Sequence, residues 1–97
     1  MIPQMTFTIS LLTLPEDRIQ DSPSGLISSI RAYLESLGIE SQYTAPVISA
    51  VDDCDNDLTE VMRGCRKIML SMKADNDYMH IKLVLRVNRD IAGIVEV

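Results

Sequence analysis

Residues 57–74 read DLTEVMRGCRKIMLSMKA, and their apolar side chains recur at intervals of three and four. This spacing places the apolar side chains on one face of an α-helix and most of the charged ones on the other. The apolar face comprises Leu58, Val61, Met62, Cys65, Ile68, Met69 and Met72. Such a helix needs a flat apolar surface to cover, and strand-like segments on both sides of it can supply one. We therefore expect a helix packed on a β-sheet.

Four segments around this helix have the pattern of β-strands. They are residues 5–12, 39–44, 47–51 and 78–88. The first and last alternate between apolar and polar side chains, which is typical of strands with one face in the core. The middle two are separated only by Ala45-Pro46, which indicates an antiparallel hairpin. The tail, residues 90–97, fits either a short added strand or a loose end.

A second amphipathic helix is predicted between the first two strands, after a charged loop at residues 13–22. Ser22 is its expected N-cap and Pro23 its first residue, where the missing N–H costs nothing. Gly38 follows it as a natural C′ residue. Its apolar face comprises Leu26, Ile27, Ile30, Tyr33, Leu34 and Leu37.

The order of elements is strand, helix, strand, strand, helix, strand. With right-handed crossovers this order predicts an α+β, ferredoxin-like βαββαβ sandwich, in which both helices cover one face of a four-stranded antiparallel sheet. The whole chain, residues 1–97, is then one domain with its core in residues 5–89. The other face of the sheet is left open. Its expected residues are Thr6, Thr8, Ser10, Leu12, Val47, Ser49, Val51, His80, Lys82, Val84 and Arg86.

Size and charge limit the classes of function. Ninety-seven residues allow one hydrophobic core. The net charge of −5 disfavours nucleic acid and anionic membranes as partners. No apolar run reaches the roughly 20 residues of a membrane span, and the N-terminus lacks a signal-peptide pattern. Cys54 and Cys65 are expected to be reduced thiols, so we predict a cytoplasmic protein.

The acidic segment before the central helix invites a calcium interpretation. Asp53, Asp55 and Asp57 hold positions 1, 3 and 5 of an EF-hand loop. Leu58 and Gly64 then stand where the loop needs a glycine and a bidentate glutamate, so a metal site is not expected. A solvated turn that caps the helix explains these carboxylates better.

His80 is the only histidine, and Ser10 and Ser49 are expected on the same open face. A nucleophile–base pair can be imagined there, but no oxyanion motif or orienting acid accompanies it. The sequence therefore favours a non-enzymatic role, with His80 as an interface or ligand-contacting residue.

Three short motifs in this order resemble the small bacterial and archaeal thiamine-binding domains, including the YkoF-like proteins. They are ISLL (9–12) before an acidic loop, VISAV (47–51) leading to an acidic turn and the helix start DLTEV (57–61), and YMHIK (78–82) opening the last strand. The resemblance extends over residues 7–89. The chain departs from the family where Asp52, Asp53 and Cys54 replace a glycine-bearing turn.

The resemblance implies a ferredoxin-like protein that binds thiamine or its hydroxymethylpyrimidine precursor. It also implies assembly into a homodimer or tetramer through the open sheet. The positions that match the family's pattern are Ser10, Ser49 and His80, and we add Thr44 and Tyr43 as candidate ligand contacts because of their side-chain chemistry. Serine, threonine and histidine can hydrogen-bond an aminopyrimidine, and a tyrosine ring can face a cationic thiazolium. The alternatives are a regulatory or oligomerising module similar to ACT domains, or a small enzyme.

Overall fold

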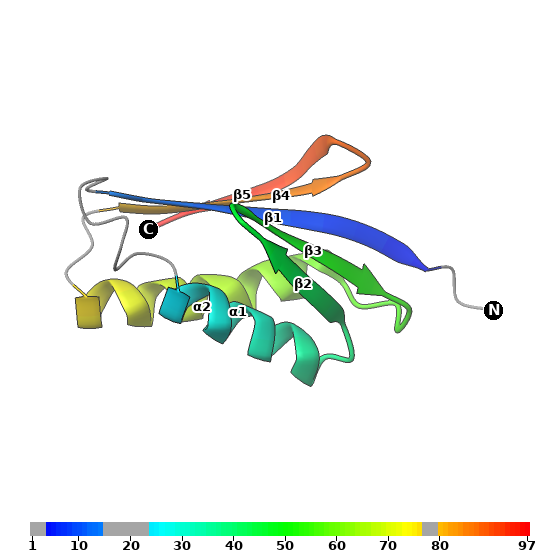
Figure 1. Ribbon diagram of the computed structural model, residues 1–97, viewed down its shortest axis with the longest axis horizontal. Helices are drawn as coiled ribbons and strands as arrows, with labels where there is room; N and C mark the ends of the chain where they lie inside the picture. The colour runs from blue at the N-terminus through cyan, green and yellow to red at the C-terminus, as the bar shows by residue number, and fades with distance from the viewer. Residues whose placement is uncertain (1–3, 15–23, 77–79) are drawn as a thin grey trace.

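The computed structural model describes residues 4–14, 24–76 and 80–97, which form five strands and two helices (Figure 1). In chain order the elements are β1 (Met5–Leu14), α1 (Ser24–Ser36), β2 (Glu40–Thr44), β3 (Val47–Asp52), α2 (Leu58–Asn76), β4 (His80–Val87) and β5 (Asp90–Glu96). The strands pair antiparallel in the order β2-β3-β1-β4-β5, so β1 lies between β3 and β4. The chain is an α+β protein with one open sheet.

The sheet has five strands, so the expectation of four was wrong. The tail forms β5, which pairs with β4. The reversal is made by Asn88 and Arg89, which both have positive φ angles, 52° and 72°. Two such residues make the tight turn whose twist matches a β-hairpin. An Asn at the first position is a known signal for this turn, but an arginine at the second is not, so the local sequence indicates the hairpin only weakly.

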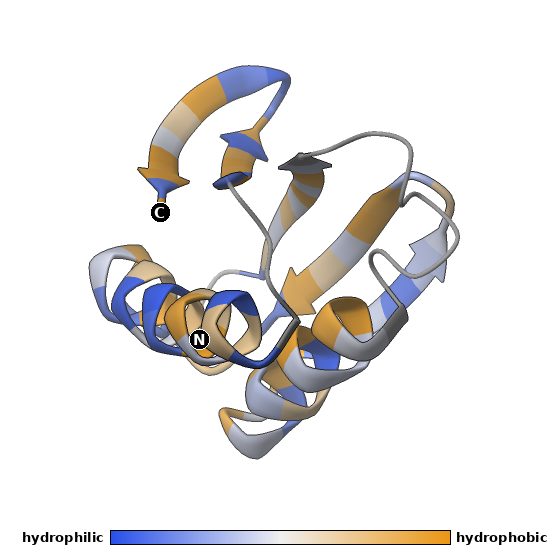
Figure 2. Ribbon diagram, turned by 90° about the vertical axis from the view of Figure 1, so that its left-hand side faces the viewer, coloured by the Kyte–Doolittle hydropathy of each residue, from blue (hydrophilic) through white to orange (hydrophobic). Residues whose placement is uncertain are grey.

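Both helices lie on one side of the sheet (Figure 1). Seen along the strands, the sheet arches over them, with β2 and β3 on the side of α1 and β5 on the side of α2 (Figure 2). The apolar faces predicted for the two helices are buried or half-buried against it. The core side chains that the strands supply are Phe7, Ile9, Ile48, Ala50, Ile81, Leu83, Leu85 and Val95.

The predicted end of the first helix is confirmed. Gly38 has a φ of +77°, and its N–H donates to the Glu35 carbonyl (2.9 Å) while the Ile39 N–H donates to the Leu34 carbonyl (2.9 Å). This pair of bonds is the Schellman motif, which satisfies carbonyls that the helix leaves free. The predicted start of the helix at Ser22 and Pro23 lies outside the described residues.

The α2 helix begins as predicted and packs closely on α1. The Asp57 carboxylate accepts a hydrogen bond from the Thr59 N–H (2.9 Å), as an N-cap does. At Gly64 the ring of Tyr33 lies directly on the α2 backbone, and the Tyr33 hydroxyl donates to the Glu60 carbonyl (3.1 Å). The described part of the chain contains no helix with the length and apolarity to cross a bilayer.

Candidate functional site

The face of the sheet opposite the helices carries the side chains predicted for it. The strand register places Thr44, Val47, Ser10, Val84 and Ile94 in one row across all five strands on this open face. Leu12 and Ile94 are 55% and 47% exposed. Polar and apolar side chains therefore alternate on a broad surface that no described element of the chain covers (Figure 1).

Three of the predicted ligand-binding residues lie near one another on the part of this face formed by β2, β3 and β1. Ser10 and Thr44 stand on either side of Val47 in the same row. Ser49 is opposite Thr8, which makes it the diagonal neighbour of Ser10, at about 7–8 Å between backbones. One small molecule can contact Ser10 and Ser49 together, and their hydroxyl groups can both donate and accept hydrogen bonds.

His80 is on the same face but far from the two serines. It pairs with Leu14, four residues along β4 from the row of Ser10, which corresponds to about 13 Å. Its Nε2 lies 3.3 Å from Glu96 Oε2, and Lys82 Nζ lies 3.7 Å from Glu96 Oε1. Within one chain, the three residues that we expected to act together do not form a single pocket, and His80 cannot reach either serine as a base.

Tyr43 points to the other side of the sheet. It is opposite Ile48, whose side chain is in the core beneath the helices, so Tyr43 stands on the helix side of the edge strand β2. Its ring cannot face a ligand held by Ser10 and Ser49. The alternation of residues 39–44 already places Tyr43 and Thr44 on opposite faces of this strand, so the prediction that both contact one ligand was wrong for Tyr43.

A hollow of about 580 Å³ lies on the open face at the end where the β4–β5 hairpin turns. We call it the arginine hollow, and it is lined by Thr6, Thr8, Ser49, Val51, Arg86 and Arg89 among others. Of the predicted binding residues only Ser49 belongs to it. The sequence pattern placed Arg86 on the open face. Arg89 was missed because its position depends on the turn that creates β5.

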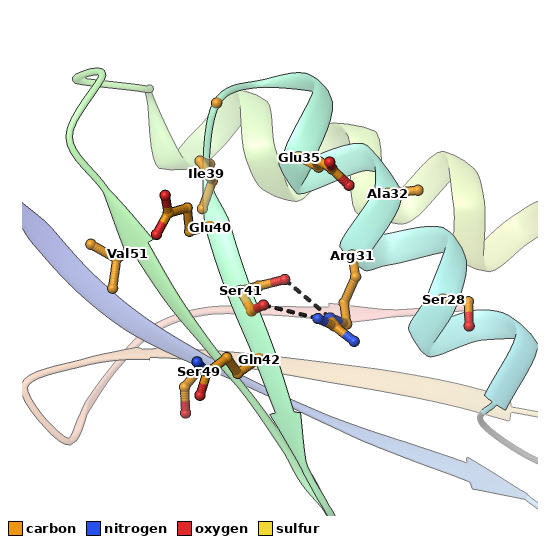
Figure 3. Close-up of a pocket in the computed structure, with 11 residues that line it drawn as sticks. Ser28, Arg31, Ala32, Glu35, Ile39, Glu40, Ser41, Gln42, Ser49 and Val51 are labelled. Carbon is orange, nitrogen blue, oxygen red and sulfur yellow. Dashed lines mark hydrogen bonds between the residues drawn. The ribbon is translucent and has the colours of Figure 1, made fainter.

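A second and wider groove of about 1000 Å³ runs around the edge strand β2 (Figure 3). Arg31 reaches from α1 to Ser41, donating from Nε to the Ser41 hydroxyl (3.2 Å) and from Nη2 to its carbonyl (2.9 Å). Ser41 stands on the helix side of β2, whereas Gln42 stands on the open side with Ser49. Because the groove includes both faces of one strand, it does not enclose a ligand.

Asp52 is a structural residue of the turn before α2, and it is buried although it belongs to an acidic segment. Its side chain is 1% exposed on the helix side of the sheet. Its Oδ1 accepts from the Cys54 N–H (2.9 Å) and the Asn56 side-chain amide (3.0 Å), and its Oδ2 accepts from the Asn56 N–H (2.9 Å). Burial raises the pKa of Asp52, but these hydrogen bonds outweigh it and leave the pKa below its ordinary value. Asp52 is therefore unavailable to a ligand on the open face.

Neither cysteine is paired. Cys54 is exposed and Cys65 is buried in the core, where burial raises the pKa of its thiol to about 12. Among the described residues, no group of three or more histidine, cysteine, aspartate or glutamate side chains is placed to hold a metal ion. The chemistry available on the open face is hydrogen bonding by hydroxyls and guanidinium groups.

Comparison with known proteins does not add a family to this description. No protein-family model, no curated protein and no solved structure matches the chain significantly.

Proposed function

We propose that the chain is a non-enzymatic binding protein for a small molecule of the thiamine or hydroxymethylpyrimidine class, and that two copies pair through the open sheet face. The strand order β2-β3-β1-β4, with both helices on one side, supports a ferredoxin-like core to which β5 is added. The observation that carries the proposal is the uncovered row from Thr44 to Ile94. Exposed apolar side chains suit a partner surface, and the hydroxyls among them suit a ligand enclosed beneath it.

The hydroxyl groups supply orientation more than affinity. Ser10, Thr44 and Ser49 can hydrogen-bond the ring nitrogens and amino group of an aminopyrimidine, at about 1 kcal/mol net for each bond. Enclosure of the ligand between two sheets must supply most of the binding free energy. Because His80 lies about 13 Å from the row of Ser10 within one chain, it would contact the same ligand only from the partner copy.

The charge around the site favours the pyrimidine precursor over thiamine. Arg86 is opposite Thr8, which is in turn opposite Ser49, so a guanidinium group borders the hydroxyl cluster. A permanently cationic thiazolium would be repelled there, whereas the uncharged hydroxymethylpyrimidine would not.

Calorimetric titration with hydroxymethylpyrimidine and thiamine tests the ligand class. We expect heat of binding with hydroxymethylpyrimidine and weaker or no heat with thiamine. Ser49→Ala should weaken binding about fivefold, as expected for the loss of one hydrogen bond of about 1 kcal/mol. Ser71→Ala, an exposed serine on α2, is the matched control and should change nothing. Absence of binding by both compounds at millimolar concentration would remove the proposal.

Sedimentation equilibrium tests the assembly. Ile94→Glu places a charge on the open face at the edge strand β5 and should shift the protein to monomer, because a desolvated carboxylate without a partner is costly. Leu70→Glu is the control, since Leu70 is similarly exposed (42%) but lies on α2. A wild-type protein that is monomeric at high concentration, with and without ligand, would contradict pairing.

A regulatory or oligomerising module similar to ACT domains is the second candidate. It is favoured by the exposed apolar side chains Leu12, Ile91 and Ile94, which support assembly without any ligand. A dimer that dissociates in the Ile94→Glu variant but binds neither compound would point to this alternative.

A further inference from the structure

We infer that the arginine hollow binds the phosphate group of a small phosphate monoester. Under the proposed function, on which this step rests, the ligand is the phosphorylated form of the pyrimidine precursor. The inference concerns residues that the expected binding set did not include, chiefly Arg86 and Arg89.

The first support is the positive charge in an acidic protein. The chain has 14 acidic residues against nine lysines and arginines, yet two of those arginines line one hollow that contains no carboxylate. Asp90 follows Arg89 in the chain but pairs with Val87, on the helix side of the sheet. On the open face, Glu40 is three strands from Arg86, and Glu96 is opposite Lys82, four residues along β4. A guanidinium group matches phosphate geometry with two parallel hydrogen bonds, so two arginines in a hollow whose lining has no carboxylate suit an anion.

The second support is the arrangement of hydroxyl groups beside the arginines. Ser49 and Arg86 are each directly opposite Thr8, on β3 and β4 respectively, so the three side chains form one row on the open face. Neighbouring side chains in such a row begin about 5 Å apart. Hydroxyl donors from Thr8 and Ser49 and guanidinium donors from Arg86 can therefore converge on the oxygens of one phosphate group.

The third support is the position of the hollow relative to the hydroxyl cluster. Ser49 belongs to both, because it lines the hollow and is the diagonal neighbour of Ser10. A molecule with its phosphate at Arg86 can extend its ring toward Ser10 and Thr44. The volume of about 580 Å³ is within the usual range for small-molecule sites.

Binding of phosphate compounds to the full chain tests the inference. Hydroxymethylpyrimidine phosphate is titrated by calorimetry beside unphosphorylated hydroxymethylpyrimidine, and inorganic phosphate is followed by phosphorus NMR. We expect the phosphate ester to bind at least about tenfold more tightly than the unphosphorylated compound. We also expect Arg86→Gln to remove this difference, and Arg89→Gln to reduce it.

Arg66→Gln is the matched control, because Arg66 is exposed on α2 and its loss changes the net charge equally. Circular dichroism verifies that each variant is folded. Equal affinity for the two pyrimidine compounds would overturn the inference. So would an equal loss of affinity for the phosphate ester in Arg66→Gln and Arg86→Gln.

The two proposals fail separately. If the unphosphorylated pyrimidine binds and phosphate adds nothing, the arginine hollow is not a phosphate site and the proposed function stands. The opposite outcome has two parts: inorganic phosphate binds and loses affinity in Arg86→Gln, and neither pyrimidine compound binds more tightly than inorganic phosphate. In that case the hollow is a phosphate site and the proposed pyrimidine class of ligand is wrong.

Discussion

Asp52 shows how one buried carboxylate holds a turn in place. It accepts three hydrogen bonds from Cys54 and Asn56, and the Asn56 amide also donates to the Leu37 carbonyl at the end of α1 (3.1 Å). The turn before α2 is thereby joined to the turn after α1. A run of acidic residues in the sequence indicates a solvated loop, and nothing in its composition distinguishes the one carboxylate that is buried from its exposed neighbours.

We predict that Asp52→Asn lowers the free energy of unfolding by about 1–3 kcal/mol near neutral pH, because one accepting oxygen and the charge are lost. The folded-state pKa of Asp52 is lowered, so its stabilising contribution is present above the unfolded-state pKa of about 3.9 and is lost as the pH falls through the folded-state pKa. Urea unfolding of both proteins should therefore give a difference that is largest near neutral pH and shrinks in acid. Asp53→Asn, at an exposed position, is the control. A difference that stays constant with pH would contradict this role of the charge.

At the scale of elements, the close approach of α1 and α2 depends on Gly64. A Cβ at this position would overlap the ring of Tyr33, so the glycine provides the space in which the ring lies on the α2 backbone. Helical periodicity predicted both helices and both apolar faces. It could not predict this contact, because an isolated glycine inside a helix shows in the sequence only as a residue of low helix propensity.

Gly64→Ala should destabilise the protein by about 1–3 kcal/mol, because overpacking outweighs the gain of about 1 kcal/mol in helix propensity. Gly25→Ala in α1 is the matched control, since its added Cβ would have only an ordinary contact with Met72 at 3.8 Å. Thermal unfolding of both variants measures the contrast. If Gly64→Ala were as stable as Gly25→Ala, the ring contact would not limit the packing of the two helices.

For the strands, the sequence pattern predicts the face on which a side chain lies but not its position relative to neighbouring strands. Alternation along β1, β3 and β4 predicted which side chains lie on the open face, because a strand with one side in the core has a strict period of two. The same pattern could not predict how far apart two side chains on different strands lie along the strand direction, because this depends on the register. His80 shares a face with Ser10 and Ser49, but the register of β4 against β1 places it near the opposite end.

In the whole molecule, the open face is the broadest surface of the sheet that no described element covers. Its apolar side chains favour a second copy, its hydroxyls favour a polar ring, and its arginines favour an anionic group. The fold could be derived to within one strand, since two amphipathic helices and a sheet have few ways to bury their apolar faces. The arginine hollow could not, because it depends on the β4–β5 turn.

The most direct test is an amide NMR titration of the full chain with hydroxymethylpyrimidine. We predict that the largest shifts fall at Ser10, Thr44 and Ser49, on the open face of β1, β2 and β3. Shifts confined to the groove around Arg31 and Ser41, or the absence of any shift at millimolar ligand, would contradict it.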